Sequence, residues 1–360
     1  MRILHVITSL DTGGAERLMV DMLPLLQQID GIDVELLLFN GVETPFKKEL
    51  ICKGVKIYQL NEVADLQNRW CIYNPLNICK LRKFIKQYDI VHTHNTACQY
   101  YVPIAKCLFG TSAILVTTEH SSTNRRRTKQ WLRTAEKWMY RQYAKIICIS
   151  DQTRDNLDRY LGESHSSTTI YNGVDISRFL GPVKDISGQN QFVITMVSAF
   201  REQKDHETLL KAMTLLPNNY HLQLVGRGRT EQKTKEQCNE LGLSNVSFMG
   251  MRSDVVDILN GTDVIVLSSH WEGLSLSSIE GMASGRPFVA SDVDGLREIV
   301  SGAGVLFPHG DEKALASAIR ELCENPTYYK QVAQSCQERA KNYDITKMAQ
   351  AYYELYESLL

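Results

Sequence analysis

The sequence predicts an α/β protein built from two doubly wound, mainly parallel sheets. Short apolar runs rich in β-branched residues alternate with helical patterns along all 360 residues. Apolar strands separated by helices are typical of parallel sheets that are covered on both faces. The alternation occurs twice, on either side of GPVKDISGQNQ (residues 181–191), a segment without periodicity and with the composition of a linker. Two domains are also the natural expectation for a chain of this length.

We expect a first domain over residues 1–180, a second over 181–343 and a C-terminal helix over 344–360. The expected strands of the first domain are RILHVITSL, DVELLLFN, VKIYQL, DIVHTHN, AILVTTEH, KIICIS and TTIYNG. Those of the second are QFVITMVSAF, YHLQLVGRG, VSFMG, DVIVLSS, PFVASD and GVLFP. Expected helices between them include residues 15–28, 74–87, 124–144, 205–216 and 230–241. In the C-terminal helix Asp344 is the expected N-cap, and the apolar stripe consists of Ile345, Met348, Tyr352, Leu355 and Leu359.

Composition excludes several classes of protein. With 43% hydrophobic and 22% charged residues the chain is typical of globular proteins. No apolar stretch approaches the roughly 20 residues of a membrane-spanning helix, and the N-terminal MRILHVITSL lacks the features of a signal peptide. The nine cysteines include no C-x-x-C pair, which favours reduced thiols in a cytoplasm over disulfides or a zinc site.

A local basic excess lies in the first half of the chain. Residues 1–180 contain 23 Lys and Arg against 18 Asp and Glu, whereas residues 181–360 contain 17 against 23. Within residues 124–145 a single acid, Glu136, accompanies a series of cations: Arg125, Arg126, Arg127, Lys129, Arg133, Lys137, Arg141 and Lys145. The opposite arc of the expected helix holds Trp131, Leu132, Ala135, Trp138 and Met139.

Two interpretations of this helix remain open. A basic face with tryptophans is typical of contact with an anionic membrane surface, and it is equally common on a helix that covers a sheet. No nucleic-acid-binding module accompanies it, so nucleic acid is not an expected partner.

The segment SSHWEGLSLSSIEGMASGRPFVASD is the most informative part of the chain. Glu272 follows an expected strand and Glu280 lies in the next expected helix, so both carboxylates are placed near the same crevice. The N–H groups of Gly273, Leu274 and Ser275 lie at the expected helix N-terminus, where unpaired donors and the helix dipole favour a phosphate. Two solvated surface glutamates are the alternative on spacing alone.

Other turns of the second domain carry related signals. Arg201 and Lys204 follow the first strand of that domain, where two cations are suited to neutralising a departing diphosphate. In VGRGR, Gly226 and Gly228 predict a tight turn that lets the backbone approach a ligand. The third glycine of a dinucleotide fingerprint is absent, so NAD is not expected.

The first domain offers a glycine turn and a polar cluster. Gly13 and Gly14 follow the first strand and permit close approach of the backbone to a bound group. His92, His94, Asn95, Glu119 and His120 lie at the ends of two neighbouring expected strands. No carboxylate partner stands at a metal-ligand spacing, so a cluster for sugar hydroxyls is favoured over a metal site.

With these motifs in order, the chain resembles the retaining family-4 glycosyltransferases of the GT-B fold over nearly its whole length. The most specific part is the E-x7-E segment, Glu272-GLSLSSI-Glu280-GMASGRPFVASDVDGLREIV. It is accompanied by Gly13-Gly14, H-x-H-N at 92–95, TEHS at 118–121, ISDQTRDNL at 149–157, YNGVD at 171–175, and Arg201 with Lys204.

The resemblance implies two Rossmann-like domains across a cleft, with the C-terminal helix crossing back onto the first domain. It also implies a role for each matching residue. Glu280 would bind the ribose hydroxyls and Glu272 the transferred sugar, while Arg201 and Lys204 would neutralise the diphosphate with help from the N–H groups of residues 273–275. Met251 and Arg252 would line the base, Gly13 and Gly14 would close over the phosphates, and His120 would hydrogen-bond the donor sugar. On the acceptor side we expect His94, Asn95 and Asn172.

The expected activity is retaining, metal-independent transfer of a sugar from a nucleotide-sugar, with UDP-sugars favoured, to a saccharide or lipid-linked saccharide in surface glycan synthesis. The nucleotide-sugar is a co-substrate, and no cofactor is expected. The expected location is the cytoplasm, including the inner face of the cell membrane if the basic helix contacts it. A sugar-nucleotide epimerase or hydrolase on the same scaffold is the alternative, and it would need a general base. A silent scaffold protein would be expected to have lost Arg201, Lys204 or one of the two glutamates, and all four are present.

Overall fold

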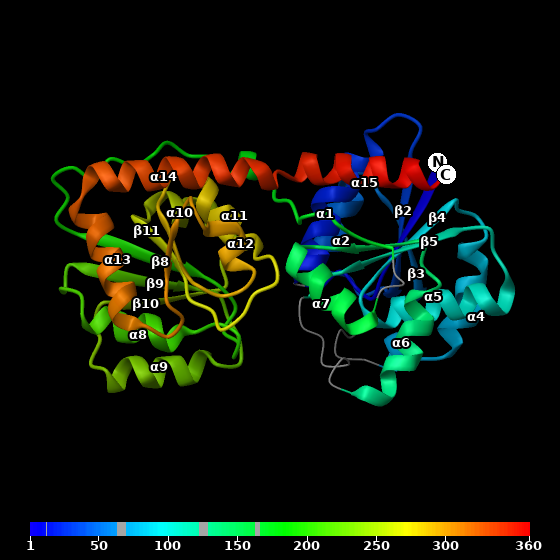
Figure 1. The fold of residues 1–360 in the computed structure, drawn as a ribbon, viewed down its shortest axis with the longest axis horizontal. Helices are drawn as coiled ribbons and strands as arrows, with labels where there is room; N and C mark the ends of the chain where they lie inside the picture. The colour runs from blue at the N-terminus through cyan, green and yellow to red at the C-terminus, as the bar shows by residue number, and fades with distance from the viewer. Residues whose placement is uncertain (12, 63–69, 122–128, 163–165) are drawn as a thin grey trace. The chain divides into compact units, whose positions relative to one another are not determined.

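The computed structural model of the protein describes residues 1–11, 13–62, 70–121, 129–162 and 166–360. The chain forms two compact units (Figure 1). Unit 1 comprises Met1–Gly173 together with Ile345–Leu360, and unit 2 comprises Val174–Asp344. The first unit therefore ends at Gly173, before the boundary expected at residue 180. Each unit is an α/β layer structure around one parallel sheet, which confirms the predicted fold class.

Unit 1 has a seven-stranded parallel sheet in the order β3-β2-β1-β4-β5-β6-β7. Its strands are β1 (Arg2–Ile7), β2 (Asp33–Asn40), β3 (Lys56–Asn61), β4 (Ile90–His94), β5 (Ile114–Glu119), β6 (Lys145–Cys148) and β7 (Ser167–Thr169). The strand order reverses between β1 and β4, so their carboxyl ends form a topological switch point.

The helices of unit 1 cover both faces of this sheet. They are α1 (Gly14–Gln27), α2 (Pro45–Cys52), α3 (Trp70–Tyr73), α4 (Leu76–Ile85), α5 (Thr96–Phe109), α6 (Arg133–Tyr140), α7 (Asp151–Leu161) and α15 (Ile345–Leu359), with a short 3-10 turn η2 (Gln130–Leu132). Along β1, Ile3 and Ile7 pack in the core beneath α1 and α15, whereas Leu4 and Val6 pack in the core beneath α4, α5 and α6. This alternation explains why β1 carries apolar residues on both faces, with His5 as its one buried polar residue.

Unit 2 repeats the arrangement with six parallel strands in the order β10-β9-β8-β11-β12-β13. Its strands are β8 (Phe192–Val197), β9 (Tyr220–Val225), β10 (Val246–Gly250), β11 (Val264–Leu267), β12 (Phe288–Ser291) and β13 (Val305–Phe307). Its helices are α8 (His206–Thr214), α9 (Glu231–Glu240), α10 (Val255–Gly261), α11 (Leu276–Ala283), α12 (Leu296–Val300), α13 (Glu312–Glu324) and α14 (Pro326–Ala340), with 3-10 turns η3 (Ile176–Arg178) and η4 (Lys341–Tyr343). The switch point of this sheet lies between β8 and β11.

The C-terminal helix α15 packs on unit 1 beside α1 (Figure 1). Its fully buried residues are Ile345, Met348, Ala349, Tyr352 and Tyr356. Leu355 and Leu359 of the predicted stripe are only partly buried against this core. Tyr356 takes the place nearest the sheet because its hydroxyl finds polar partners there, which are described below.

The basic segment differs from its prediction. The single helix expected over 124–144 is the turn η2 followed by the eight-residue helix α6, and Arg125, Arg126 and Arg127 lie outside the described residues. The buried face of α6 is formed by Glu136, Met139 and Tyr140. Trp131 and Trp138, predicted to lie on the apolar arc, are instead 76% and 41% exposed.

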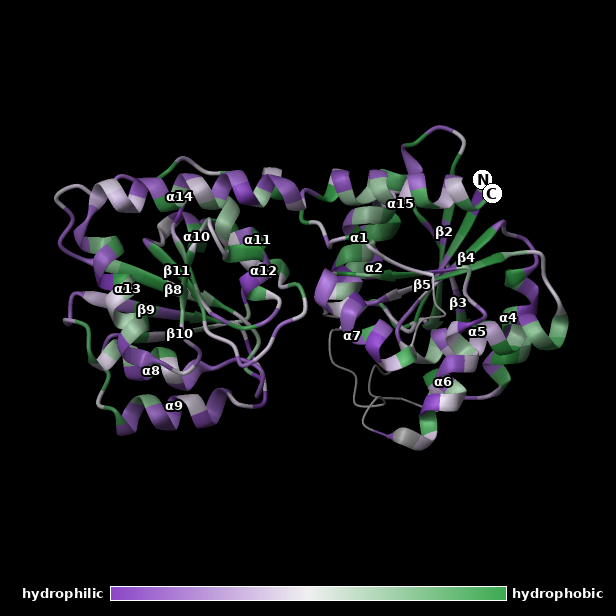
Figure 2. Ribbon diagram, viewed as in Figure 1, coloured by the Kyte–Doolittle hydropathy of each residue, from purple (hydrophilic) through white to green (hydrophobic). Residues whose placement is uncertain are grey.

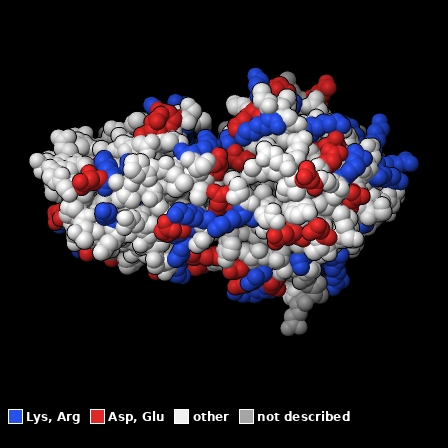
Figure 3. Space-filling view, turned by 90° about the horizontal axis from the view of Figure 1, so that it is seen from above, with Lys and Arg blue, Asp and Glu red and all other residues white. Residues whose placement is uncertain are grey.

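In each unit the sheet is more hydrophobic than the helices that cover it (Figure 2). Figure 2 shows the strands as the most hydrophobic segments, with mixed helices around them. In the view of Figure 3, acidic and basic side chains are interspersed on each unit without a field of one sign. Among the described helices, none is both long and apolar enough to cross a membrane.

Candidate functional site

In each unit several of the residues singled out in the sequence follow the strands that flank the switch point of the sheet. In unit 2, Arg201 and Lys204 follow β8, and Glu272 follows β11. In unit 1, Gly13 is the N-cap of the helix after β1, and Asn95 follows β4 directly. Because ligands of open α/β sheets bind at this position, the switch point of each sheet is a candidate binding site.

Lys204 and Glu272 form a nearly buried ion pair between the β8 and β11 loops of unit 2. Their side chains are 12% and 7% exposed, and Lys204 Nζ bonds Glu272 Oε1. Ser269 Oγ donates to the same carboxylate oxygen over 2.7 Å, and Gln203 Nε2 donates to Glu272 Oε2 over 3.0 Å. Glu272 is therefore not a solvated surface residue, because its carboxylate is held in place from three sides.

Backbone hydrogen bonds join the same two loops. The His270 N–H donates to Gln203 O over 2.8 Å, and the Asp205 N–H donates to Ser268 O over 3.1 Å. Lys204 and Ser269 additionally form an isolated antiparallel bridge. Gln203, Ser268 and Ser269 were not singled out in the sequence, because nothing in the composition of a loop reveals which of its residues faces another loop.

Arg201 remains exposed next to this rigid pair. It contributes with Lys204, His206, Lys233 and His270 to the lining of a small polar recess. Burial lowers the pKa of His206 to about 4, so this ring is neutral near pH 7. The recess is also lined by Glu202, Asp205 and Glu207, so its three cations, Arg201, Lys204 and Lys233, lie beside three carboxylates. Of these cations, Arg201 and Lys204 follow β8 at the switch point, where they are suited to an oxyanion.

The helix that carries Glu280 begins next to Glu272. Ser275 caps α11 in an extended conformation and makes no side-chain capping hydrogen bond. The predicted Gly273 and Leu274 lie just before the helix, Leu274 is 6% exposed, and Glu280 is half-buried within it. The first turn of α11 thus presents backbone N–H groups at the switch point, as an anion site requires.

Gly295 supports this loop and was not singled out in the sequence. It has φ +81°, and a Cβ atom there would lie 2.0 Å from Gly273 O and 2.7 Å from Glu272 O. No residue with a side chain fits in this place. The loop of Glu272 and Gly273 therefore depends on a glycine some twenty residues further along the chain.

The glycines of VGRGR have a structural role. Gly226 approaches Ser198 O and Gly228 approaches Phe200 O so closely that an added Cβ would lie 2.0 and 2.1 Å away, respectively. The close approach of the backbone that was predicted toward a ligand is instead made to the β8 loop that carries Arg201. Further along the edge, after β10, Met251 is 67% exposed and Arg252 is ion-paired with Asp254.

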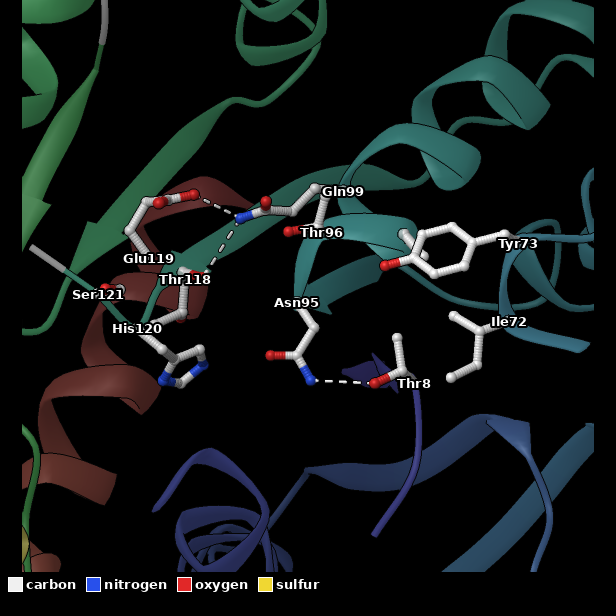
Figure 4. A pocket seen from close by; sticks show the side chains of 11 residues that line it. Thr8, Ile72, Tyr73, Asn95, Thr96, Gln99, Thr118, Glu119, His120 and Ser121 are labelled. Atoms are coloured by element: carbon white, nitrogen blue, oxygen red, sulfur yellow. Dashed lines mark hydrogen bonds between the residues drawn. The ribbon is translucent and has the colours of Figure 1, made fainter. Parts of the chain in front are cut away.

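Unit 1 has a cavity of about 320 Å³ at its own switch point (Figure 4). It is lined by Thr8, Ile72, Tyr73, Asn95, Thr96, Ala97, Gln99, Thr118, Glu119, His120 and Ser121. The buried Glu119 accepts hydrogen bonds from Gln99 Nε2 and from the Tyr140 hydroxyl, both over 2.6 Å. The volume lies at the lower end of the range of small-molecule sites. Thr8, Tyr73 and Gln99 were not foreseen, since their segments carry no motif.

Asn95 holds a conformation that side-chain-bearing residues rarely adopt. Its φ of +67° and ψ of 155° lie in a region used almost only by glycine, and no other non-glycine residue of the described ranges has a positive φ. Its amide Nδ2 donates to Thr8 Oγ1 over 3.2 Å (Figure 4). Strain of this kind, about 1–3 kcal/mol, is typical of ligand-binding positions.

The remaining predicted residues of unit 1 lie in different surroundings. Gly13 is the extended N-cap of α1, which begins at Gly14, and neither has a positive φ. Asn172 is 6% exposed, and its Oδ1 has no hydrogen-bond partner within the described ranges. The structure brings His94, Asn95 and His120 together, since His94 Nδ1 and His120 Nε2 are 2.9 Å apart.

His94 belongs to a cluster with His5 and His92 whose nitrogens lie within 4.8 Å of one another, a spacing compatible with a metal ion. All six ring nitrogens are nevertheless used in hydrogen bonds: with one another, with Tyr356, with Thr118 and with His120. The rings stack at centroid distances of 4.4–5.2 Å. The donor set therefore fits a hydrogen-bonded chain.

Comparison with known proteins agrees with this geometry. Residues 12–178 match the family described as Glycosyltransferase Family 4, and residues 183–343 match the family described as Glycosyl transferases group 1. A UDP-Gal:alpha-D-GlcNAc-diphosphoundecaprenol alpha-1,3-galactosyltransferase of Escherichia coli is 26% identical over 305 residues, 78% of each chain. The lipopolysaccharide core biosynthesis mannosyltransferase LpsB of Rhizobium meliloti is 27% identical over 261 residues, 67% of this chain and 72% of that protein.

A crystal structure of Anabaena HepE in complex with UDP and glucose has the same fold, with a TM-score of 0.84 and 23% identity over 99% of this chain and 100% of that one. The two Rossmann-like units define a protein of the GT-B class. Because a glycosyltransferase domain lies in each unit and the relatives are glycosyltransferases, the protein is a glycosyltransferase.

Proposed function

We propose that the protein transfers a sugar, with retention of configuration and without a metal ion, from a UDP-sugar to a saccharide or lipid-linked saccharide. The observation that carries the proposal is the Lys204–Glu272 pair at the switch point of unit 2. It combines a fixed cation with a fixed carboxylate beside an exposed arginine and a helix N-terminus, which are the groups that a diphosphate and a sugar require.

In this proposal, Arg201, Lys204 and the N–H groups of Gly273, Leu274 and Ser275 stabilise the departing UDP. Fixed positive groups aimed at developing negative charge replace a metal ion in this role. Glu272 accepts hydrogen bonds from hydroxyls of the transferred sugar, and Glu280 from those of the ribose. Glu272 is not a nucleophile here, because its oxygens are already held by Lys204, Ser269 and Gln203.

Retention is part of the proposal, and no nucleophile is positioned for the sugar among the described residues of this site, which favours attack on the same face over a covalent sugar–enzyme intermediate. The glycosidic bond to the diphosphate breaks first, the charge on the sugar is oxocarbenium-like, and the acceptor hydroxyl attacks from the same face. A phosphate oxygen of the leaving UDP takes the hydroxyl proton. Met251 and Arg252, which follow β10, line the base, and Gly13 and Gly14 contact the phosphate side from unit 1.

The cavity of unit 1 takes the acceptor in this proposal, with Asn95 in its lining and His120 next to the transferred sugar. His94 and Asn172, expected on the acceptor side, are not among the residues that line this cavity. The diphosphoundecaprenol in the name of the E. coli relative favours a lipid-linked acceptor. The lipopolysaccharide core in that of the Rhizobium relative favours surface glycan synthesis.

We further propose that unit 1 contacts an anionic membrane surface from the cytoplasm. Exposed Trp131 and Trp138 accompany Arg133 on η2 and α6, and Trp70 on α3 is 73% exposed. The helix α5 links these elements, because Tyr101 donates to Tyr73 O over 2.6 Å and Tyr100 donates to Glu136 over 3.2 Å. Exposed aromatic rings beside cations are typical of proteins that lie on lipid headgroups.

A panel of UDP- and GDP-sugars tests the transfer reaction. The protein is incubated with each donor, with and without lipid-linked saccharides and with EDTA, and free nucleotide is measured. We expect release that depends on both a UDP-sugar and an acceptor and persists in EDTA, and an axial or equatorial product linkage matching that of the donor. Donor conversion without any acceptor would favour the alternative, a sugar-nucleotide epimerase or hydrolase. Absence of both turnover and donor binding would exclude the transferase.

Liposome co-sedimentation tests the membrane contact separately. We expect binding to vesicles with anionic lipid to exceed binding to neutral vesicles and to fall when Trp131 and Trp138 are both replaced by Ser. Trp271, which is 44% exposed in unit 2, provides the matched control Trp271→Ser. Equal partitioning into neutral and anionic vesicles would contradict the electrostatic part of this proposal.

A further inference from the structure

We propose that a buried chain of hydrogen bonds fixes the tautomer of His120, so that its Nδ1 atom carries the hydrogen and acts as a hydrogen-bond donor at the cavity of unit 1. The chain begins at Tyr352 on α15 and ends at His120, after β5. That this N–H group binds a sugar rests on the proposed function. The tautomer itself does not depend on the proposed function.

Six contacts connect seven side chains in this chain. From the inner end, Tyr352 Oη lies 3.1 Å from Thr118 Oγ1, which lies 2.8 Å from His92 Nε2. His92 Nδ1 lies 2.6 Å from Tyr356 Oη, which lies 3.3 Å from His5 Nε2. His5 Nδ1 lies 3.0 Å from His94 Nε2, and His94 Nδ1 lies 2.9 Å from His120 Nε2.

Each of the seven groups has one hydrogen to donate when the imidazoles are neutral. Burial lowers the pKa of His5 to about 3 and that of His120 to about 4, and it lowers the pKa of His92 and His94 well below their usual value. All four rings are therefore neutral near pH 7. Seven hydrogens share six contacts, so one hydrogen remains and must leave the chain at one of its two ends.

The inner end offers no place for that hydrogen. Tyr352 is fully buried, and within the described ranges the one hydrogen-bond partner of its hydroxyl is Thr118. If each group donated toward the inner end, the Tyr352 O–H would be buried without an acceptor. A buried donor without an acceptor costs free energy of folding. His120 at the outer end is half-buried and lines the cavity (Figure 4).

The chain therefore runs outward. Tyr352 donates to Thr118, each further group donates to the next, and His94 Nδ1–H donates to His120 Nε2. The remaining hydrogen lies on His120 Nδ1. His94 is a positioning residue in this arrangement, because it selects the tautomer of His120 without itself presenting a group to the cavity.

This tautomer decides what His120 does chemically. Its only lone pair in the ring plane is on Nε2 and is occupied by the hydrogen from His94, so the ring has no site at which to take a proton from an acceptor hydroxyl. Nδ1–H instead donates to an oxygen of a bound sugar. His120 thus binds and orients, and it is not a general base.

Nitrogen-15 NMR of the full-length protein labelled in its histidines measures the tautomer directly, since a ring nitrogen with a hydrogen resonates far from a bare one. His120 is assigned by the loss of its signals in His120→Gln. At pH 7 we expect its Nδ1 in the protonated range and its Nε2 in the bare range. The reverse pattern, or two nitrogens at an averaged shift, would overturn the proposal.

Two variants test the chain as the cause. His94→Leu removes the last contact, and both His120 nitrogens should move toward the averaged shift of a freely exchanging ring. Tyr352→Phe removes one hydrogen and one contact, so six hydrogens share five contacts and one hydrogen again remains. The nitrogen shifts of His120 should therefore be the same as in the native protein. An unchanged pattern in His94→Leu, or a reversed one in Tyr352→Phe, would overturn the chain. If His94→Leu does not fold, the native protein and Tyr352→Phe still decide.

Kinetics then test the donor role with the active substrate pair. His120→Gln retains a hydrogen-bond donor and takes no proton, whereas His120→Leu has neither property. We expect the turnover of His120→Gln to exceed that of His120→Leu at least tenfold, and equal loss in both would overturn the donor role. The NMR pattern is recorded without substrates, so a protein with the expected tautomer and no transfer would contradict the proposed function alone.

Discussion

Lys204 of the β8 loop forms an ion pair with Glu272 of the β11 loop, and the pair lies at the switch point of the unit 2 sheet. Both side chains are nearly buried, and Ser269 and Gln203 complete the shell of the carboxylate. A cation at this place can stabilise the negative charge of a leaving diphosphate, and a carboxylate can accept hydrogen bonds from sugar hydroxyls. Their contact keeps both groups in position when neither ligand is bound.

Lys204→Ala should reduce both stability and turnover. The substitution leaves the Glu272 carboxylate partly buried without its cation, at an expected cost of about 1–3 kcal/mol in the free energy of unfolding. The matched control is Lys211→Ala on α8, whose pair with Glu207 is about half exposed, so its removal should cost under about 0.5 kcal/mol. Denaturant unfolding and nucleotide release measure the two effects. Similar values for the two variants would argue against a role for the buried pair.

Gly295→Ala should distort the Glu272 loop. The new Cβ would collide with Gly273 O, and the φ of +81° is strained for any side chain. Gly310→Ala is the control, because Gly310 has φ +76° and open space around it, so that only the strain of about 1–2 kcal/mol applies. We expect weaker binding of the nucleotide-sugar in Gly295→Ala alone, measured by calorimetry. Native affinity in that variant would mean that the loop tolerates the displacement.

Substitutions of Asn95 should separate the cost of its strained backbone from the function of its amide. Glycine adopts its backbone conformation without strain, so Asn95→Gly should be at least about 1 kcal/mol more stable than Asn95→Ala in denaturant unfolding. Both variants lose the amide and should lose transfer activity alike. If Asn95→Ala were as stable as Asn95→Gly, the strain assigned to Asn95 would be disproved.

Acid should destabilise unit 1 before unit 2. Burial lowers the native pKa of His5, His92, His94 and His120, so below pH 6.5 the unfolded chain binds protons that the native unit does not. Above pH 7 the four rings are neutral in the folded and in the unfolded chain, so they add no pH dependence. As the pH decreases below 6.5, the free energy of unfolding falls by about 1.4 kcal/mol per pH unit for each histidine once the unfolded form is protonated.

In unit 2, His206 is the one histidine with a lowered pKa among the described residues. Hydrogen exchange followed by mass spectrometry at pH 7, 6 and 5, corrected for the intrinsic rate, should therefore show protection lost first in unit 1. Parallel loss in the two units would contradict the neutral state assigned to the four histidines.

Much of the fold was predictable because apolar strands and helical periodicity recur along the chain. The placement of Arg201, Lys204 and Glu272 at one sheet edge was predictable for the same reason, since strand ends of a parallel sheet share an edge. The partners that fix them were not. Gln203 and Gly295 act through contacts across some 70 and 20 residues of sequence, and no local pattern records such contacts.

The C-terminal helix illustrates the same limit. Its apolar stripe predicted burial, but Tyr356 rather than Leu355 faces the sheet, because the choice depends on His5 and His92 more than 260 residues earlier. The exposure of Trp131 and Trp138 was also hidden, since a helical pattern shows which residues share a face and leaves open which face meets the sheet. Roles of individual site residues stay predictions.

Calorimetric titration with UDP tests the central claim most directly, namely that the switch point of unit 2 binds a nucleotide diphosphate. The account predicts that the native protein binds UDP in EDTA, and that Arg201→Ala and Glu280→Ala each weaken binding at least tenfold, the value of one lost charge-assisted hydrogen bond. Arg297→Ala, at an exposed pair with Asp292, is the control and should leave the affinity unchanged. Native affinity in both Arg201→Ala and Glu280→Ala would contradict the account.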